Sequence, residues 1–162
     1  MHANANRALA LGFFLLVAAP HIAMAQAGDM RARCARVGND DRLRPLETSL
    51  IPQAKRAFEL GPEMSRALVV ATTSMRCMGG QVWLCNAGAN LACGKAGVSR
   101  ASAGADRFCK ANPNSSDVPM AATGHATIYA WKCVGTKARV DRSFARVDAR
   151  GFIVDNWKKL AP

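Results

Sequence analysis

Six cysteines constrain the fold of this 162-residue chain more than any other feature of its sequence. An even number of cysteines in a small exported protein predicts disulfide bonds, because each cross-link restricts the unfolded chain and adds about 2 to 4 kcal/mol of stability. No two of them have the Cys-x-x-Cys spacing of a zinc knuckle, so we expect structural disulfides rather than metal ligands. The six residues are Cys34, Cys77, Cys85, Cys93, Cys109 and Cys133.

Export is expected from residues 1–25, which have the layout of a secretory signal peptide. Arg7 precedes an apolar stretch at 8–19, and Ala23-Met24-Ala25 offers small residues at the cleavage positions. This stretch is shorter than the roughly 18 to 20 residues that a helix needs to span a bilayer, so we expect no membrane-spanning anchor. Cleavage after Ala25 would deliver a periplasmic or secreted protein.

The chain that follows the expected signal peptide is strongly basic. Arg7 is the only one of the 22 Lys and Arg residues before residue 26, so 21 bases remain against 11 acids, a net charge of +10. Such a surface attracts polyanions, and anionic envelope polymers or lipid head groups are the expected partners. Nucleic acid is a less favoured partner, because Tyr129 is the only tyrosine and no stacking platform is evident.

The pattern of apolar residues predicts an α+β fold. Residues 26–50 are rich in arginine and have no clear apolar period, so we expect a basic, loosely ordered N-terminal arm. Residues 51–162 are expected to form a single small disulfide-stabilised domain, with a small antiparallel sheet of two hairpins and short helices on one face. The predicted helices cover residues 51–61, a turn or two from 62, about ten residues ending at 112, and 151–160. Pro52 suits the first turn of the first helix and Gly61 its end, and Ser99 or Ser102 is the expected cap of the helix that ends at 112.

The first predicted hairpin turns at Gly79-Gly80, a pair that suits the positive φ angles of a tight turn. If the loop consists of these two residues, Cys77 faces Val82 and Cys85 faces Ser74. The two cysteines then lie on opposite faces of the hairpin, so they should not bond to each other.

The second predicted hairpin has its first strand at 125–133 and turns near Gly135. Its end, WKCVG, resembles MRCMG in the first hairpin, which suggests a duplicated hairpin in one sheet; the alternative is that basic strands ending in glycine turns look alike. We expect a Cys93–Cys109 disulfide that joins the glycine-rich loop to the following helix. A bond from Cys133 to Cys77 or Cys85 is the second choice.

His125 is the only histidine after the expected signal peptide. Sites that need two or three imidazoles are therefore excluded, including the common catalytic zinc arrangements, and we expect no metal site. A Ser-His or Cys-His catalytic pair would have to use His125, but no Gly-x-Ser-x-Gly elbow accompanies it. No phosphate-binding loop or dinucleotide motif is present, so no cofactor is expected. The candidate binding residues are His125, Tyr129, Trp131, Arg76 and Lys132.

Three segments, RCMGGQVWLCNAGANLACGKA, TGHATIYAWKC and VDARGFIVDNWKKL, are similar to a family of short exported bacterial proteins with no assigned function. The resemblance covers residues 45 to 160 and implies a bacterial, periplasmic setting. It carries no catalytic residue or cofactor. Cys34 lies outside the region of resemblance, which leaves its partner open.

These features favour a non-enzymatic binding or envelope-associated protein that contacts anionic surfaces through Arg and Lys side chains. One alternative is a periplasmic hydrolase that uses His125 in a site with Tyr129 and Asp117. The other is an inhibitor of an envelope-attacking enzyme such as a lysozyme, which ranks last because two basic proteins repel each other.

Overall fold

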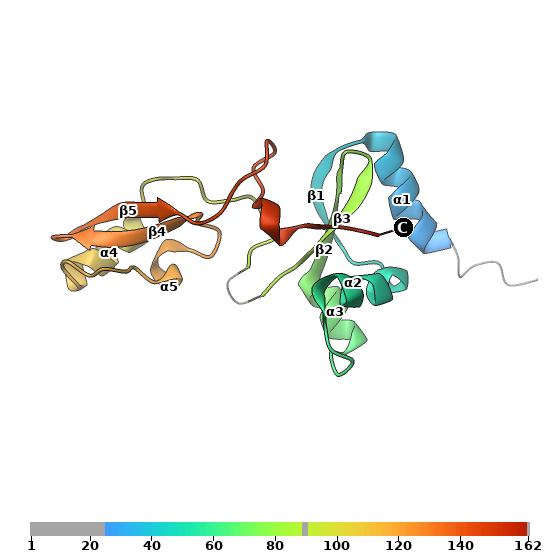
Figure 1. Ribbon diagram of the computed structural model, residues 1–162, viewed down its shortest axis with the longest axis horizontal. Helices are drawn as coiled ribbons and strands as arrows, with labels where there is room; N and C mark the ends of the chain where they lie inside the picture. Colours follow the sequence, from blue (N-terminus) through green and yellow to red (C-terminus); the bar gives the residue numbers. More distant parts are fainter. Residues whose placement is uncertain (1–24, 89–90, 162) are drawn as a thin grey trace, which may run out of the picture.

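The computed structural model describes residues 25–88 and 91–161. The prediction of a signal peptide falls on residues 1–25, which lie outside the described part except for Ala25. Described helices and strands form an N-terminal lobe with a four-stranded sheet, and a small lobe with a two-stranded sheet (Figure 1). All strand pairs within these two sheets are antiparallel, so the α+β prediction is confirmed.

The N-terminal lobe contains the sheet β1-β2-β3-β6, and the small lobe contains β4 and β5 with two helices. In chain order, the N-terminal lobe begins with α1 (Ala25–Val37), β1 (Asp40–Pro45), the 3-10 turn η1 (Thr48–Leu50), α2 (Ile51–Phe58), α3 (Arg66–Thr72), β2 (Thr73–Met78) and β3 (Gln81–Asn86). The chain continues with α4 (Ala103–Ala111), α5 (Met120–Thr123), β4 (Tyr129–Val134) and β5 (Lys137–Ser143), and returns through the 3-10 turn η2 (Val154–Asn156) to β6 (Lys158–Lys159).

The β2–β3 hairpin has the predicted register. Cys77 pairs with Val82 and Ser74 with Cys85, across a turn in which Gly79 and Gly80 have φ angles of 57° and 74°. Two cysteines on opposite faces of one hairpin cannot reach each other, and each bonds elsewhere.

The two hairpins lie in different sheets, so the idea of one sheet built from a duplicated hairpin is wrong. Both outer edges of β2–β3 are occupied, by β1 on one side and β6 on the other. Along β4, the backbone of Ser115 and Val118 bonds to Cys133 and Trp131 at 2.8 and 3.0 Å. These edges therefore have no room to pair with each other.

Residues 26–50 are not a loosely ordered arm. They form α1, β1 and η1, and their buried residues Met30, Cys34, Leu46 and Leu50 share one core with β2 and β3. The few apolar residues of this segment are spaced to fall on one side, since Met30 and Cys34 are four residues apart in a helix. Arginine between them obscured that pattern in the sequence.

The two helices predicted after residue 50 with clear end signals are confirmed. In α2, Pro52 lies in the first turn as predicted, but the helix ends at Phe58, before the predicted end at Gly61, and its C-cap Glu59 has a left-handed backbone conformation. In α4, the side chain of Ser102 accepts a hydrogen bond from the N–H of Ala105 at 3.2 Å, as an N-cap residue does.

The closing helix predicted over residues 151–160 is wrong. This segment is extended apart from η2, and β6 pairs with β3 through Trp83 and Leu84. Phe152 and Trp157 are buried without a helix. The backbone N–H and C=O groups at the edge of β3 need hydrogen-bond partners. An extended segment can pair with them and a helix cannot, so the segment pairs as a strand.

Each disulfide lies in a different hydrophobic cluster. Cys34–Cys77 crosses the core of the N-terminal lobe, Cys109–Cys133 joins α4 to β4 in the small lobe, and Cys85–Cys93 belongs to a third cluster with Phe152 and Trp157. The predicted Cys93–Cys109 bond and the predicted bonds from Cys133 to Cys77 or Cys85 are therefore wrong. None of the six cysteines is free.

Candidate functional site

The predicted binding residues do not gather in one place. Tyr129, Trp131 and Lys132 follow one another along β4 of the small lobe, and the rings of Tyr129 and Trp131 meet edge to face at 6.3 Å. His125 is exposed just before this strand. Arg76 lies on β2 in the other lobe, with a completely buried side chain, so it does not face an external ligand as we had expected of a binding residue.

The ring of His125 is exposed and has no hydrogen-bond partner among the described residues. The neighbouring residues Gly124 and Ala126 line a small pocket, but the side chain of His125 does not. All six cysteines are oxidised, so no thiol is available to it as a nucleophile. The geometry offers no nucleophile–base pair around His125.

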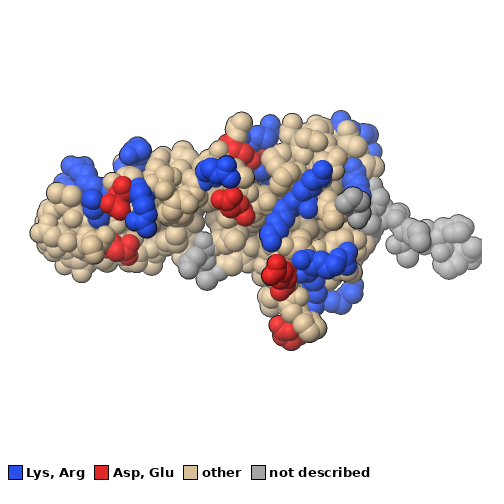
Figure 2. All heavy atoms as spheres, in the orientation of Figure 1, with Lys and Arg blue, Asp and Glu red and all other residues tan. Residues whose placement is uncertain are grey.

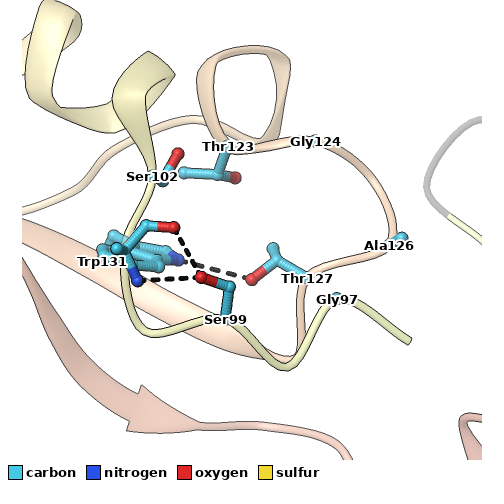
Figure 3. Close-up of a pocket in the computed structure, with 9 residues that line it drawn as sticks. Gly97, Ser99, Ser102, Thr123, Gly124, Ala126, Thr127 and Trp131 are labelled. Carbon is cyan, nitrogen blue, oxygen red and sulfur yellow. Dashed lines mark hydrogen bonds between the residues drawn. The ribbon is translucent and has the colours of Figure 1, made fainter. Parts of the chain in front are cut away.

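Two pockets of the small lobe share three lining residues, Ala101, Ser102 and Trp131. The first, the hydroxyl pocket, has a volume of about 140 Å³. Figure 3 shows its hydroxyl-bearing side chains around the indole of Trp131. These are Ser99, Ser102, Thr123 and Thr127.

Hydrogen bonds fix most of these hydroxyls. The Trp131 indole N–H donates to Thr127 Oγ1 at 3.4 Å, and Ser99 Oγ donates to the carbonyl of Ala101 at 2.9 Å (Figure 3). No titratable side chain lines this pocket. It can therefore receive a small group that forms hydrogen bonds, but it supplies no acid or base.

The second pocket, the basic pocket, has a volume of about 220 Å³. Three cationic side chains line it: Arg100 from the loop before α4, and Lys137 and Arg139 from β5. The two strand residues alternate with buried Ala138, as the period of a strand requires. Residues 37 positions apart in the chain thus converge on one hollow.

The only carboxylate in the lining of the basic pocket, Asp106, already has a partner. Its Oδ1 accepts a hydrogen bond from the backbone N–H of Ala138 at 3.0 Å, which holds α4 against the edge of β5. Within the described ranges, no carboxylate forms an ion pair with Arg100, Lys137 or Arg139. The pocket therefore has an excess of positive charge.

Two other basic residues of the same sheet, Lys132 and Arg142, share an ion-pair partner, which the three cations of the basic pocket lack among the described residues. Lys132 and Arg142 both pair with Asp141, at 2.8 and 3.2 Å. The hydrogen bond from Lys132 is the main cause that lowers the pKa of Asp141. Lys132, one of the predicted binding residues, thus forms an ion pair within the protein.

Arg100 is positioned by an aromatic ring. Its guanidinium lies 5.3 Å from the ring centre of Tyr129, whose hydroxyl donates to the carbonyl of Val98 at 3.4 Å. A cation over an aromatic face keeps its charge available for an anion while its orientation is restricted. Tyr129 therefore orients a cation of the basic pocket, and Trp131 lines the pocket; both remain predicted binding residues.

The sequence reasoning missed Arg100, Lys137, Arg139 and Ser102 as site residues. Ser102 was recognised only as a helix cap, and the Lys-Ala-Arg alternation at 137–139 marks one exposed face of a strand. Nothing local in the sequence brings Arg100 to this strand, because α4, α5 and β4 intervene.

Within the part of the chain that the structure describes, no group of three or more His, Cys, Asp or Glu side chains is placed to hold a metal ion. Among the same residues, no helix has the length and apolar character to cross a membrane. When the chain was compared with protein-family models, curated proteins and solved structures, no match was found.

Proposed function

We propose that this chain is a non-enzymatic binding protein of the periplasm or the extracellular space, and that the basic pocket binds phosphate groups of an anionic envelope component. The observation that carries the proposal is the convergence of Arg100, Lys137 and Arg139 on one hollow without an ion-pair partner among described residues. Cations held this way in a concave site attract an external anion more strongly than cations on an open surface do.

Phosphate suits the pocket better than a neutral ligand. Two arginines offer planar guanidinium forks that match phosphate oxygens, and the lysine adds a compact charge. The hydroxyl pocket behind Ser102 supplies further groups that can bond to phosphate ester oxygens or to sugar hydroxyls.

The three disulfides support an oxidising location. The hydrolase alternative has no nucleophile beside His125, and no described feature favours the inhibitor alternative. Lipid head groups and envelope polymers share the phosphate chemistry, so the experiment must separate these two sources.

The test measures binding of the oxidised protein to vesicles of phosphatidylglycerol, to vesicles of phosphatidylcholine and to soluble polyphosphate, each at low and physiological salt. The key variant is Lys137→Gln/Arg139→Gln, and its matched control is Arg107→Gln/Lys110→Gln. The control removes the same charge from exposed cations of α4 that form no ion pair in the described part. We expect the pocket variant to lose about tenfold or more in affinity for the anionic probes, and the control to lose about twofold.

Binding should also weaken as salt rises, because screening acts on exposed charges. Equal losses in the two variants would show a diffuse surface effect and contradict the proposed pocket. Absence of binding to both anionic probes at low salt would contradict the proposed function itself.

A further inference from the structure

A second basic pocket lies in the N-terminal lobe, between α2 and the C-terminal segment. Its volume is about 320 Å³. Helix α2 contributes Gln53, Arg56 and Ala57, and the C-terminal segment contributes Lys158, Lys159 and Ala161. We infer that this pocket is a second anion site, and that the two lobes together bind one flexible polymer that carries repeated phosphate groups.

The walls of the second pocket are held in place from several directions. On one side, Leu160 is buried and its N–H donates to Val82 at 2.9 Å, which anchors the segment to β3. The amine of Lys158 donates to the carbonyl of Ala57 at 2.7 Å and so ties β6 to α2. Arg31 of α1 donates to the carbonyl of Ala161 at 2.5 Å. The hollow is thus a fixed feature of the lobe rather than a gap at a loose end.

Among the described residues, the charged side chains that line this pocket are all cationic. Within residues 25–88 and 91–161, no carboxylate lines the pocket or forms an ion pair with Arg56, Lys158 or Lys159. The side chains of Arg56 and Lys159 are exposed and form no hydrogen bond with the described residues, so both can bind a ligand.

Gln53 also lies in the wall of this pocket. Its amide oxygen is buried and lacks a hydrogen-bond partner among the described residues. This oxygen can only accept a hydrogen bond, so phosphate oxygens, which are acceptors too, do not pair with it. An anion at this pocket is therefore favoured by the cations of the pocket alone.

The two basic pockets lie in different lobes. Figure 2 shows Lys and Arg side chains on both lobes. A single phosphate group can fill only one pocket. A polymer bound at one pocket presents its other phosphates to the second at a high effective concentration, which raises the overall affinity without any new contact. This step rests on the proposed function of the first pocket.

A polymer fits these pockets better than a bilayer does. Proteins that lie on membranes combine cations with apolar side chains that insert between the lipids. Large exposed apolar residues of the described chain include Leu68, Val134 and Phe144, but none of the exposed large apolar residues lines either basic pocket. Both sites therefore offer positive charge but lack exposed apolar side chains that could insert into a bilayer.

The experiment compares tripolyphosphate with long-chain polyphosphate, using the complete oxidised protein. The variant of the second pocket is Arg56→Gln/Lys159→Gln, which keeps Lys158 and its bond to α2. The control is Arg36→Gln/Arg42→Gln, two exposed cations of the same lobe that form no ion pair in the described part. We expect the pocket variant to lose about tenfold or more in affinity for the long chain and the control to lose about twofold. The difference between long and short probes should shrink in the pocket variant.

Each result separates the two proposals. If Arg56→Gln/Lys159→Gln binds the long chain as tightly as the control does, while Lys137→Gln/Arg139→Gln still loses affinity, the second site is wrong and the first pocket stands. If neither pocket variant loses more than its control, both proposals fail. If Arg56→Gln/Lys159→Gln weakens binding to phosphatidylglycerol vesicles but not to polyphosphate, a membrane and not a polymer occupies the second pocket.

Discussion

Arg76 donates a hydrogen bond to Asp148 at 2.7 Å from a side chain that is completely buried. The two residues are 72 positions apart, so their contact ties the central strand β2 to the segment that leads back from the small lobe. The guanidinium lies 3.8 Å from the ring centre of Phe152 and 4.6 Å from that of Trp157. These rings supply favourable electrostatics where Nε and Nη1 have no hydrogen-bond partner in the described part.

Asp148→Asn is expected to destabilise the protein by about 3 kcal/mol. The substitution keeps an oxygen that can accept from the N–H groups of Arg150 and Phe152, but it removes the nearer anion of the buried Arg76 and leaves only Asp41, at 3.9 Å, as an anionic partner among the described residues. Urea unfolding of the oxidised protein measures this loss. The control is Asp141→Asn, which breaks an exposed pair with Lys132 and should change the stability much less, because solvent screens exposed pairs. Similar losses in the two variants would contradict a special role for the buried pair.

The double variant Arg76→Met/Asp148→Asn tests the same point from the other side. Removal of both charges leaves a core of Met, Phe152 and Trp157 with no unpaired ion, so part of the lost stability should return. A double variant that is less stable than Asp148→Asn alone would mean that the aromatic contacts of Arg76 matter more than its pairing.

The three disulfides should contribute unequally to stability. They close loops of 43, 24 and 8 residues, for Cys34–Cys77, Cys109–Cys133 and Cys85–Cys93. The chain-entropy estimate gives about 4, about 3.4 and about 2.5 kcal/mol in that order. Paired Cys→Ala variants, compared by urea unfolding, should show the same order. An equal or inverted order would show that native-state packing in the three clusters outweighs loop closure.

Local signals in the sequence were sufficient for local structure. The glycine pair at 79–80 fixed the register of β2 and β3, because a two-residue loop determines every cross-strand pair. Ser102 and Pro52 marked helix starts that the structure confirms. These features depend on residues within one turn or one hairpin of each other, which is the range over which propensity and capping act.

Features that depend on distant contacts could not be predicted in this way. Cys34 reaches Cys77 because α1 packs on the sheet, and the weak apolar pattern of residues 26–50 concealed that helix. The segment at 151–160 has apolar spacing typical of a helix, but the open edge of β3 makes it a strand at its end. The basic pocket likewise forms only when the fold brings Arg100 to Lys137 and Arg139.

Gly104 should not tolerate a side chain. A β-carbon added at this position of α4 would overlap the carbonyl oxygen of Ala122 at the end of α5. Alanine favours a helix over glycine by about 1 kcal/mol, but the overlap is expected to outweigh this gain and to cost roughly 1 to 3 kcal/mol overall. The Gly104→Ala variant should therefore unfold at lower urea concentration than the parent protein.

Gly94→Ala is the matched control for that substitution. An added β-carbon at Gly94 meets no atom within 4 Å, and its φ angle is not positive. The control should be neutral or more stable by about 0.4 to 1 kcal/mol, because alanine reduces the freedom of the unfolded chain. If Gly104→Ala behaves like Gly94→Ala, α4 and α5 are less closely packed than the structure shows.

Four aspartates give the protein a stability that depends on acid pH. Hydrogen bonds from Arg33, Arg150 and Lys132 are the main causes that lower the pKa of Asp40, Asp41 and Asp141, respectively. Burial by itself raises the pKa of Asp148, but hydrogen bonds from Arg76 and from the N–H groups of Phe152 and Arg150 outweigh it and lower the pKa overall.

A folded-state pKa below the unfolded value of about 3.9 means that the unfolded chain takes up protons first as the pH falls. These groups therefore stabilise the fold fully above about pH 5, and their contribution is lost as the pH falls below about 4 and through the lowered values. Urea unfolding between pH 2 and pH 7 should show a plateau and then a steep decline. Asp41→Asn removes one of the four groups, together with its pairs to Lys95, Arg150 and Arg76, and should make the decline shallower. A decline of unchanged slope in this variant would mean that other carboxylates control acid unfolding.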